Sequence, residues 1–183
     1  MVIPLRPEAR AEFDQAAQRD PLTGLDCMPG FSAALRGAAR RRRGGENPWV
    51  AVAGLGGAFS NDADEPLVAD QLLATVAARL ADSVRDGDKV ARIGPDTFGL
   101  IVDAPHGDEA TVALERLAKG VASLIASDRR WAGARICIGL APLWSQDPEL
   151  ALRRASEALD RGRRRGATVA MTTGQPPASG QPA

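Results

Sequence analysis

The residue types that most often carry out covalent or metal chemistry are scarce and isolated in this sequence. Cys27 and Cys137 lie far apart in the chain, and neither has the neighbouring ligands of a metal site. The single histidine, His106, follows Pro105 in an expected loop and has no Ser, Cys or carboxylate partner arranged for nucleophilic catalysis. The sequence therefore predicts no disulfide framework, no catalytic triad and no cysteine–histidine metal site.

Two other segments have the composition of phosphate-binding sites. The glycine-rich run at residues 54–57 follows an expected strand, but no helix begins directly behind it and the third glycine of a dinucleotide-binding loop is missing. The arginines of residues 153–165 form a basic stretch. However, the chain carries 23 basic and 23 acidic residues and only 4% aromatic residues, which argues against nucleic acid as its partner.

Length and composition indicate one domain with extensions at both ends. A chain of 183 residues with 44% hydrophobic content buries one sizeable core. No apolar run is long enough for a membrane span, and the N-terminus lacks the pattern of a signal peptide. We therefore expect a cytoplasmic protein that does not enter the membrane, with a lead-in helix in residues 1–19, one domain in residues 20–172 and a disordered Pro/Gly-rich tail in residues 173–183.

The elements that must position any site follow from hydrophobic periodicity. Helices are expected at residues 7–19, 31–43, 66–84, 106–126 and 148–165, and strands at 49–55, 89–93, 97–102, 135–143 and 167–172. The helix at 66–84 is expected to bury Leu67 and Leu72, and the helix at 106–126 to bury Val112 and Leu114. This order predicts an α+β fold, in which a layered sheet carries helices on its faces.

Four stretches, in order and at suitable spacing, resemble the GGDEF family of diguanylate cyclases. They are Asp20-Pro21-Leu22-Thr23-Gly24-Leu25, the hairpin segment Val90–Phe98, the strand Arg135–Ala141 and the helix Arg154–Gly166. The resemblance implies a palm-like, ferredoxin-like fold with a central, mainly antiparallel sheet framed by helices, in agreement with the element order. It also implies a bacterial signalling function connected with cyclic di-GMP.

The signature of the family is altered in this chain. The five signature positions are occupied by Gly94, Pro95, Asp96, Thr97 and Phe98. Members of the family condense two GTP molecules with the help of divalent metal, which requires carboxylate ligands. The resemblance places these carboxylates at Thr97 and at either Ala53 or Gly54, none of which has one. We therefore expect a degenerate domain that is not an enzyme and holds no metal or other cofactor.

Some positions of the nucleotide site are retained. The resemblance aligns Asn61 and Asp70 with residues that contact guanine, Asp96 with the third signature carboxylate and Arg163 with a phosphate-binding cation. Each residue also has an ordinary structural explanation, since Asn61 suits a turn and Asp70 a helix surface.

A second family motif is present at Arg85 and Asp88, which match the spacing of the inhibitory product-binding RxxD site. The resemblance implies that Arg85 binds a phosphate or the guanine edge of cyclic di-GMP, and that Asp88 accepts from guanine N–H groups. We expect a regulatory domain that binds cyclic di-GMP here and signals to a protein partner or a second copy of itself. Two alternatives stay open: an interaction scaffold without a nucleotide ligand, and, more remotely, a residual diguanylate cyclase or GTP-binding module.

Overall fold

A six-stranded sheet forms the centre of the computed structural model, which describes residues 18–42, 47–57, 65–143 and 147–172. The order across the sheet is β1-β3-β4-β2-β5-β6. The strands are β1 (Asp26–Cys27), β2 (Pro48–Gly56), β3 (Lys89–Arg92), β4 (Thr97–Asp103), β5 (Arg135–Pro142) and β6 (Val169–Met171). The three central pairings, β3 with β4, β4 with β2 and β2 with β5, are antiparallel, while the two edge strands pair in parallel. The predicted α+β fold with a mainly antiparallel sheet is confirmed.

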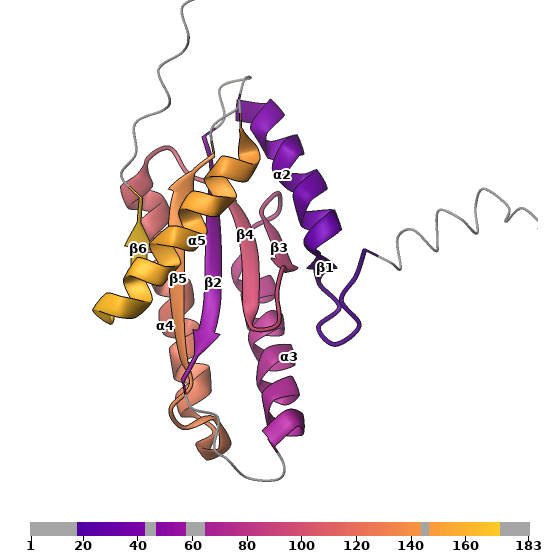
Figure 1. Ribbon diagram of the computed structural model, residues 1–183, viewed down its shortest axis with the longest axis vertical. Coiled ribbons are helices and arrows are strands. Elements are labelled where there is room, and N and C mark those ends of the chain that lie inside the picture. The colour runs from indigo at the N-terminus through magenta and orange to yellow at the C-terminus, as the bar shows by residue number, and fades with distance from the viewer. Residues whose placement is uncertain (1–17, 43–46, 58–64, 144–146, 173–183) are drawn as a thin grey trace, which may run out of the picture.

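Helices cover both faces of this sheet (Figure 1). One face carries α2 (Met28–Arg42) and α5 (Pro148–Arg165), and the other carries α3 (Glu65–Ser83) and α4 (Gly107–Ala126). A short 3₁₀ helix, η1 (Arg129–Trp131), connects α4 to β5. No helix within the described ranges is both long and apolar enough to span a bilayer.

The alternation of side chains along the strands divides the core into two layers. On β4, Phe98 and Leu100 point toward α3 and α4, whereas Ile101 points toward α2 and α5. Leu72 of α3 and Phe31 of α2 are 0% and 1% exposed in these two layers. Each helix pair is therefore fixed by its own apolar contacts with the sheet.

The fifth helix is defined at both ends by capping. Asp147 accepts a hydrogen bond from the Leu150 N–H at 2.9 Å, and Pro148 occupies the first turn, where its missing N–H costs nothing. At the other end Gly166 has φ of 67°, a left-handed conformation that favours glycine. Because capping defines both ends of α5, the last turn of this helix holds Arg163 over the sheet.

Several sequence-based details differ from the structure. The short strand β1 and the helix η1 were not expected, because two or three residues are too few to give a periodic signal. Leu67 and Val112 were expected inside but are 69% and 55% exposed. Each lies well off the buried stripe of its helix, since Val112 stands two residues from the buried Leu114, or about 200° around the axis. The lead-in segment at 1–17, Asn61 and the tail at 173–183 lie outside the described residues.

Candidate functional site

The altered signature forms the turn of the β3–β4 hairpin. The N–H groups of Ile93 and Gly94 donate to the Thr97 carbonyl at 2.9 and 3.1 Å, which closes the turn. The Leu55 N–H donates to the Asp96 carbonyl at 2.9 Å and ties this turn to the end of β2. Thr97 donates its hydroxyl to the Asp96 carboxylate at 2.8 Å. The segment that replaces the signature is therefore an ordered hairpin held against the neighbouring strand.

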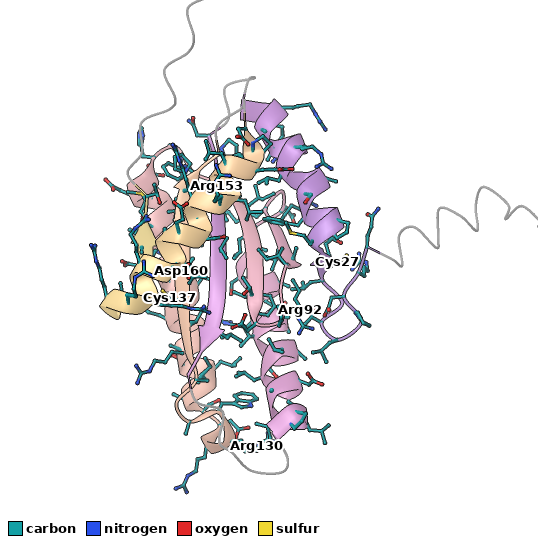
Figure 2. The ribbon with its side chains drawn as sticks, viewed as in Figure 1. Cys27, Arg92, Arg130, Cys137, Arg153 and Asp160 are labelled. Carbon is teal, nitrogen blue, oxygen red and sulfur yellow. The ribbon has the colours of Figure 1, made fainter. Side chains whose placement is uncertain are left out.

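Arg92 fixes the hairpin from the side of β1, as the labelled side chain in Figure 2 shows. Its Nη1 contacts both Asp20 carboxylate oxygens at 3.1 Å, and its Nε and Nη2 donate to the carbonyls of Gly94 at 3.3 Å and Pro95 at 2.7 Å. Asp20 also accepts from the N–H and the hydroxyl of Thr23 at 2.8 and 2.7 Å. Sequence analysis did not single out Arg92, although Arg92 and Asp20 both lie in stretches that carry the family resemblance.

These contacts change the acidity of Asp20. Burial alone raises the pKa of its carboxyl, but hydrogen bonds from Thr23 and Arg92 together with the charge of Arg92 outweigh burial, so the pKa falls below its ordinary value of 3.8. A lowered folded-state pKa stabilises the protein above the unfolded-state pKa of about 4, and this stabilisation is lost as the pH falls toward the folded-state value.

Asp20→Asn is expected to flatten the dependence of folding stability on pH between about pH 5 and pH 3, because the variant has no carboxylate to protonate there. The measurement is the free energy of unfolding from urea titrations across that range. Asp160→Asn is the matched control, since Asp160 is an exposed carboxylate of α5 without a hydrogen bond or ion pair among the described residues. It should keep the wild-type slope, and an unchanged slope in Asp20→Asn would contradict the assignment.

Arg163 and Asp96, two of the predicted nucleotide-site residues, are brought together at the end of β2. The Arg163 Nη2 donates to the Leu55 carbonyl at 2.8 Å and lies 3.6 Å from the Asp96 carboxylate. A Cβ at Gly54 would collide with the Arg163 guanidinium, whose Cζ would be 2.9 Å away. Glycine at position 54 therefore permits the approach of the cation to the strand.

The residues around Arg163 do not fit a site for a divalent cation. Ala53 is fully buried and Gly54 lies beneath the guanidinium, so neither supplies an oxygen ligand from its side chain. Asp96 is already engaged by Thr97 and Arg163. Within the described ranges, no three His, Cys, Asp or Glu side chains gather as metal ligands.

The other predicted guanine-contacting residue in the described ranges is not brought into this cluster. Asp70 is exposed on α3 and makes no hydrogen bond or ion pair with any described residue. Its partner in the prediction, Asn61, lies outside the described residues.

Arg85 and Asp88 lie in the turn between α3 and β3, at a separate place from the hairpin. The Asp88 carboxylate accepts from the Arg85 N–H at 3.1 Å and from the N–H of Asp103, the last residue of β4, at 3.3 Å. Gly87 has φ of 98°, which allows this tight turn. The Arg85 side chain is exposed, and among the described residues it makes no hydrogen bond or ion pair. The turn thus carries an exposed arginine side chain without a partner among the described residues, together with a carboxylate fixed by backbone donors.

Comparison with known proteins settles the family. The family model described as "Diguanylate cyclase, GGDEF domain" matches residues 17–168, which is most of the chain. The chain belongs to the GGDEF family.

Relatives of this GGDEF domain are found by sequence in two bacteria. Over 100 residues, half of this chain, it is 28% identical to the probable diguanylate cyclase DgcC of Escherichia coli K12. Over 111 residues, 60% of this chain, it is 32% identical to the diguanylate cyclase DgcP of Pseudomonas aeruginosa. The matches cover only 27% and 16% of those two proteins, respectively, so they concern one part of each relative.

Solved structures show the same fold. The coiled coil and GGDEF domain of DgcB from Caulobacter crescentus, in complex with c-di-GMP, superposes with a TM-score of 0.77 at 22% identity, covering 90% of this chain and 91% of that one. The GGDEF domain of FimX from Pseudomonas aeruginosa superposes with a TM-score of 0.69 at 25% identity, covering 85% and 99%.

The expectation that the chain is not an enzyme is contradicted by these relatives. DgcC and DgcP are named as diguanylate cyclases, and the matching family model carries the same name. That expectation rests on two missing carboxylates, at Thr97 and at either Ala53 or Gly54, and it concerns one way of holding metal. It does not by itself remove the domain from the enzymes of the family.

A cleft of about 1240 Å³ opens beside Arg163 in this GGDEF domain and includes residues of β2, η1 and β5. Gly54, Gly56 and Gly57 line it, so strand backbone is accessible there. Cys137 also lines the cleft, but burial raises the pKa of its thiol, and its Sγ donates to the Ala167 carbonyl at 3.0 Å. The thiol is therefore protonated at neutral pH and poorly nucleophilic.

Proposed function

We propose that this GGDEF domain binds cyclic di-GMP at Arg85 and Asp88, and that binding there regulates the domain. The observation that supports the proposal is the exposed Arg85 side chain, which has no partner among the described residues and belongs to the same turn as the Asp88 carboxylate, to which the Arg85 backbone N–H donates. A relative of the same fold, DgcB, was solved in complex with c-di-GMP.

The chemistry of this pair suits the ligand. A guanidinium donates two parallel hydrogen bonds to a phosphate or to the acceptor edge of guanine. A carboxylate accepts from the N–H groups of guanine, and each Asp88 oxygen retains a lone pair beyond the one used by the backbone. The two side chains together therefore provide donors and an acceptor for one guanylate unit.

The position of Asp88 offers a route from ligand binding to the hairpin. Asp88 directly precedes β3, and its carboxylate holds the end of β4 through the Asp103 N–H. At the other end of β3, Arg92 grips the hairpin carbonyls and Asp20. A ligand that binds Asp88 therefore acts on the β3–β4 pair, and the altered signature lies at the far end of that pair. A displacement along these two strands is the regulatory change that we propose.

Arg85→Ala is expected to weaken binding of cyclic di-GMP by at least about tenfold, because a hydrogen bond from a charged group contributes about 1.5 to 3 kcal/mol. Isothermal titration calorimetry of the wild-type chain and the variant measures this. Arg116→Ala is the matched control, since it removes an exposed arginine of α4 and should leave the affinity unchanged.

Arg85→Lys refines the same experiment. A lysine keeps the charge but loses the two-pronged donor geometry, so we expect an affinity between those of the wild type and Arg85→Ala. Absence of binding heat from the wild-type chain would refute the proposal. Equal affinities in the wild type and Arg85→Ala would move the ligand to another site.

A second candidate is an interaction scaffold without a nucleotide ligand. It is favoured by the fact that one Asp88 oxygen closes the α3–β3 turn and the other holds the end of β4, structural roles that are sufficient to explain the residue. A protein partner is compatible with either candidate, and a relative of similar fold, SiaD, was solved in complex with its activator SiaC. Incubation with GTP and Mg²⁺, followed by detection of cyclic di-GMP, tests the activity for which the relatives are named.

The proposal includes a cytoplasmic location. Cys27 and Cys137, which both lie in the described ranges, are not joined in a disulfide, which suits a reducing compartment. Fractionation of the natural host cells, with detection of the chain in the soluble fraction, tests this point.

A further inference from the structure

A shallow groove of about 220 Å³ lies between α2 and the first turns of α5, away from both sites described above. Its apolar surface comes from Met28, Leu35, Pro148 and Leu152, and Ser32 lies between them. Met28 is 40% exposed although its side chain is large and apolar. An unbranched, flexible methionine at such a site adapts to side chains of different shape.

One arginine lines this groove, and two others lie close to its lining residues along the same helices. Arg36 lines it, Arg40 lies one helical turn further along α2, and Arg153 follows Leu152 on α5 (Figure 2). All three are exposed, and none makes a hydrogen bond or ion pair among the residues that the structure describes. Glu149 supplies the one carboxylate among the groove-lining residues in the described ranges. The groove therefore combines apolar side chains with one arginine and one glutamate in its lining, and Arg40 and Arg153 add positive charge on the two helices that form it.

The two helical layers differ in net charge, so the excess of basic residues extends beyond the groove over the layer that contains it. The α2 sequence contains arginines at positions 36, 40, 41 and 42 and no acidic residue. The opposite layer is acidic on balance: α3 has three acidic residues and one basic residue, and α4 has three acidic and two basic residues. An anionic partner is thus attracted to the α2–α5 face and repelled from the other.

We propose that this groove binds an acidic amphipathic helix of a partner protein, with an apolar side chain seated between Met28, Leu35 and Leu152. Acidic residues on the same helix would pair with Arg36, Arg40 and Arg153. A peptide helix in a groove uses this combination of apolar anchors and charged flanks. The groove lining includes neither Arg85 nor Asp88, so the proposal does not rest on cyclic di-GMP binding.

The observations favour a peptide over a nucleic acid. Single-stranded nucleic acid is held by aromatic side chains on which bases stack, and the groove lining contains none in the described residues. The groove instead offers aliphatic surface, which a phosphate backbone does not use.

The test measures fluorescence anisotropy of a labelled helical peptide of about twelve residues, built from Leu and Glu at helical spacing. We expect saturable binding to the wild-type chain, weakened when NaCl rises from about 50 to about 500 mM. The double charge reversal Arg36→Glu/Arg153→Glu should weaken binding by at least about tenfold. Arg116→Glu/Lys119→Glu, on α4, changes net charge equally and should leave binding within about twofold.

A second variant tests the apolar contact separately. Ser32→Phe fills the groove but leaves the arginines in place, so it should abolish binding of the Leu/Glu peptide. Circular dichroism and thermal unfolding verify that each variant is folded. A peptide with Ala in place of Leu should bind at least about tenfold more weakly, because it has lost its anchors.

The proposal is overturned by absence of peptide binding to the wild-type chain. It is also overturned if the α4 control variant loses peptide binding equally, or if the Ala-containing peptide binds as tightly as the Leu/Glu peptide. Either result would mean that general charge attraction explains the contact. Tighter binding of a labelled single-stranded oligonucleotide that is likewise lost in Arg36→Glu/Arg153→Glu would assign the surface to nucleic acid instead.

Discussion

Gly139→Ala is expected to lower the free energy of unfolding by about 3 kcal/mol, near the upper end of the usual cost of overpacking. Gly139 lies in β5 directly beneath α5, and a Cβ there would collide with the Ala155 carbonyl oxygen and the Leu159 N–H nitrogen. The Leu159 Cα would be 2.9 Å away. These are helix backbone atoms, so no change of rotamer relieves the collision and the whole helix must move.

The displacement of α5 has a consequence at the candidate site. Arg163 is one turn beyond Leu159, and its hydrogen bond to the Leu55 carbonyl depends on the position of α5 against the sheet. We therefore expect Gly139→Ala to increase hydrogen exchange at the Arg163 end of α5 as well as to lower the urea midpoint. Gly56→Ala is the control, because no atom lies within 4 Å of its added Cβ, and it should change stability by less than about 0.5 kcal/mol. Equal stabilities in the two variants would show that α5 does not rest on Gly139.

The sheet and its helices could be predicted because each long element has a clear hydrophobic period. α5, for example, begins at Pro148 and ends at Arg165 as predicted from its start and stop signals. The arrangement of strands came from the resemblance rather than from periodicity, since alternation along a strand does not reveal its neighbours. The exposure of Leu67 and Val112 was not predicted, because their apolar side chains received more weight than their angular positions around the helix axis.

Less of the site was accessible to sequence reasoning. Arg163 and Asp96 could be predicted as site residues from the motifs. The position of the Arg163 guanidinium over Gly54, however, depends on a close approach between α5 and β2. Asp88 was assigned to a ligand, whereas the structure shows it also bonded to the backbone of β4, fifteen residues away. Contacts between distant segments are set by the packing of whole elements, which no local pattern records.

The prediction that the chain is not an enzyme failed for a related reason. The prediction infers a loss of enzymatic activity from the missing carboxylates, although activity is a property of a whole site in its assembly. The family relatives named as diguanylate cyclases contradict that step.

Arg92→Ala is expected to lower the free energy of unfolding by about 2 to 3 kcal/mol, between the values typical of exposed and of buried ion pairs. The Arg92 and Asp20 side chains are 16% and 17% exposed, so loss of the guanidinium leaves a carboxylate mostly shielded from water. The carbonyls of Gly94 and Pro95 lose their donor as well. Faster amide exchange at Ile93 and Gly94 should accompany the lower urea midpoint, because the turn then keeps only its own bonds to Thr97 and the contacts of Asp96 with Leu55 and Arg163.

Arg92→Lys separates charge from geometry in this contact. A single ammonium cannot reach the carboxylate and both carbonyls together, so the variant should recover only part of the lost stability. A double-mutant cycle with Asp20→Ala should give a coupling energy of at least about 1 kcal/mol, because the two residues act on each other directly. Additive losses would mean that Arg92 stabilises the hairpin through its carbonyls alone. The turn at Asp20 would then not stabilise the altered signature directly, and the long-range contacts of that segment would be those of Asp96 with Leu55 and Arg163.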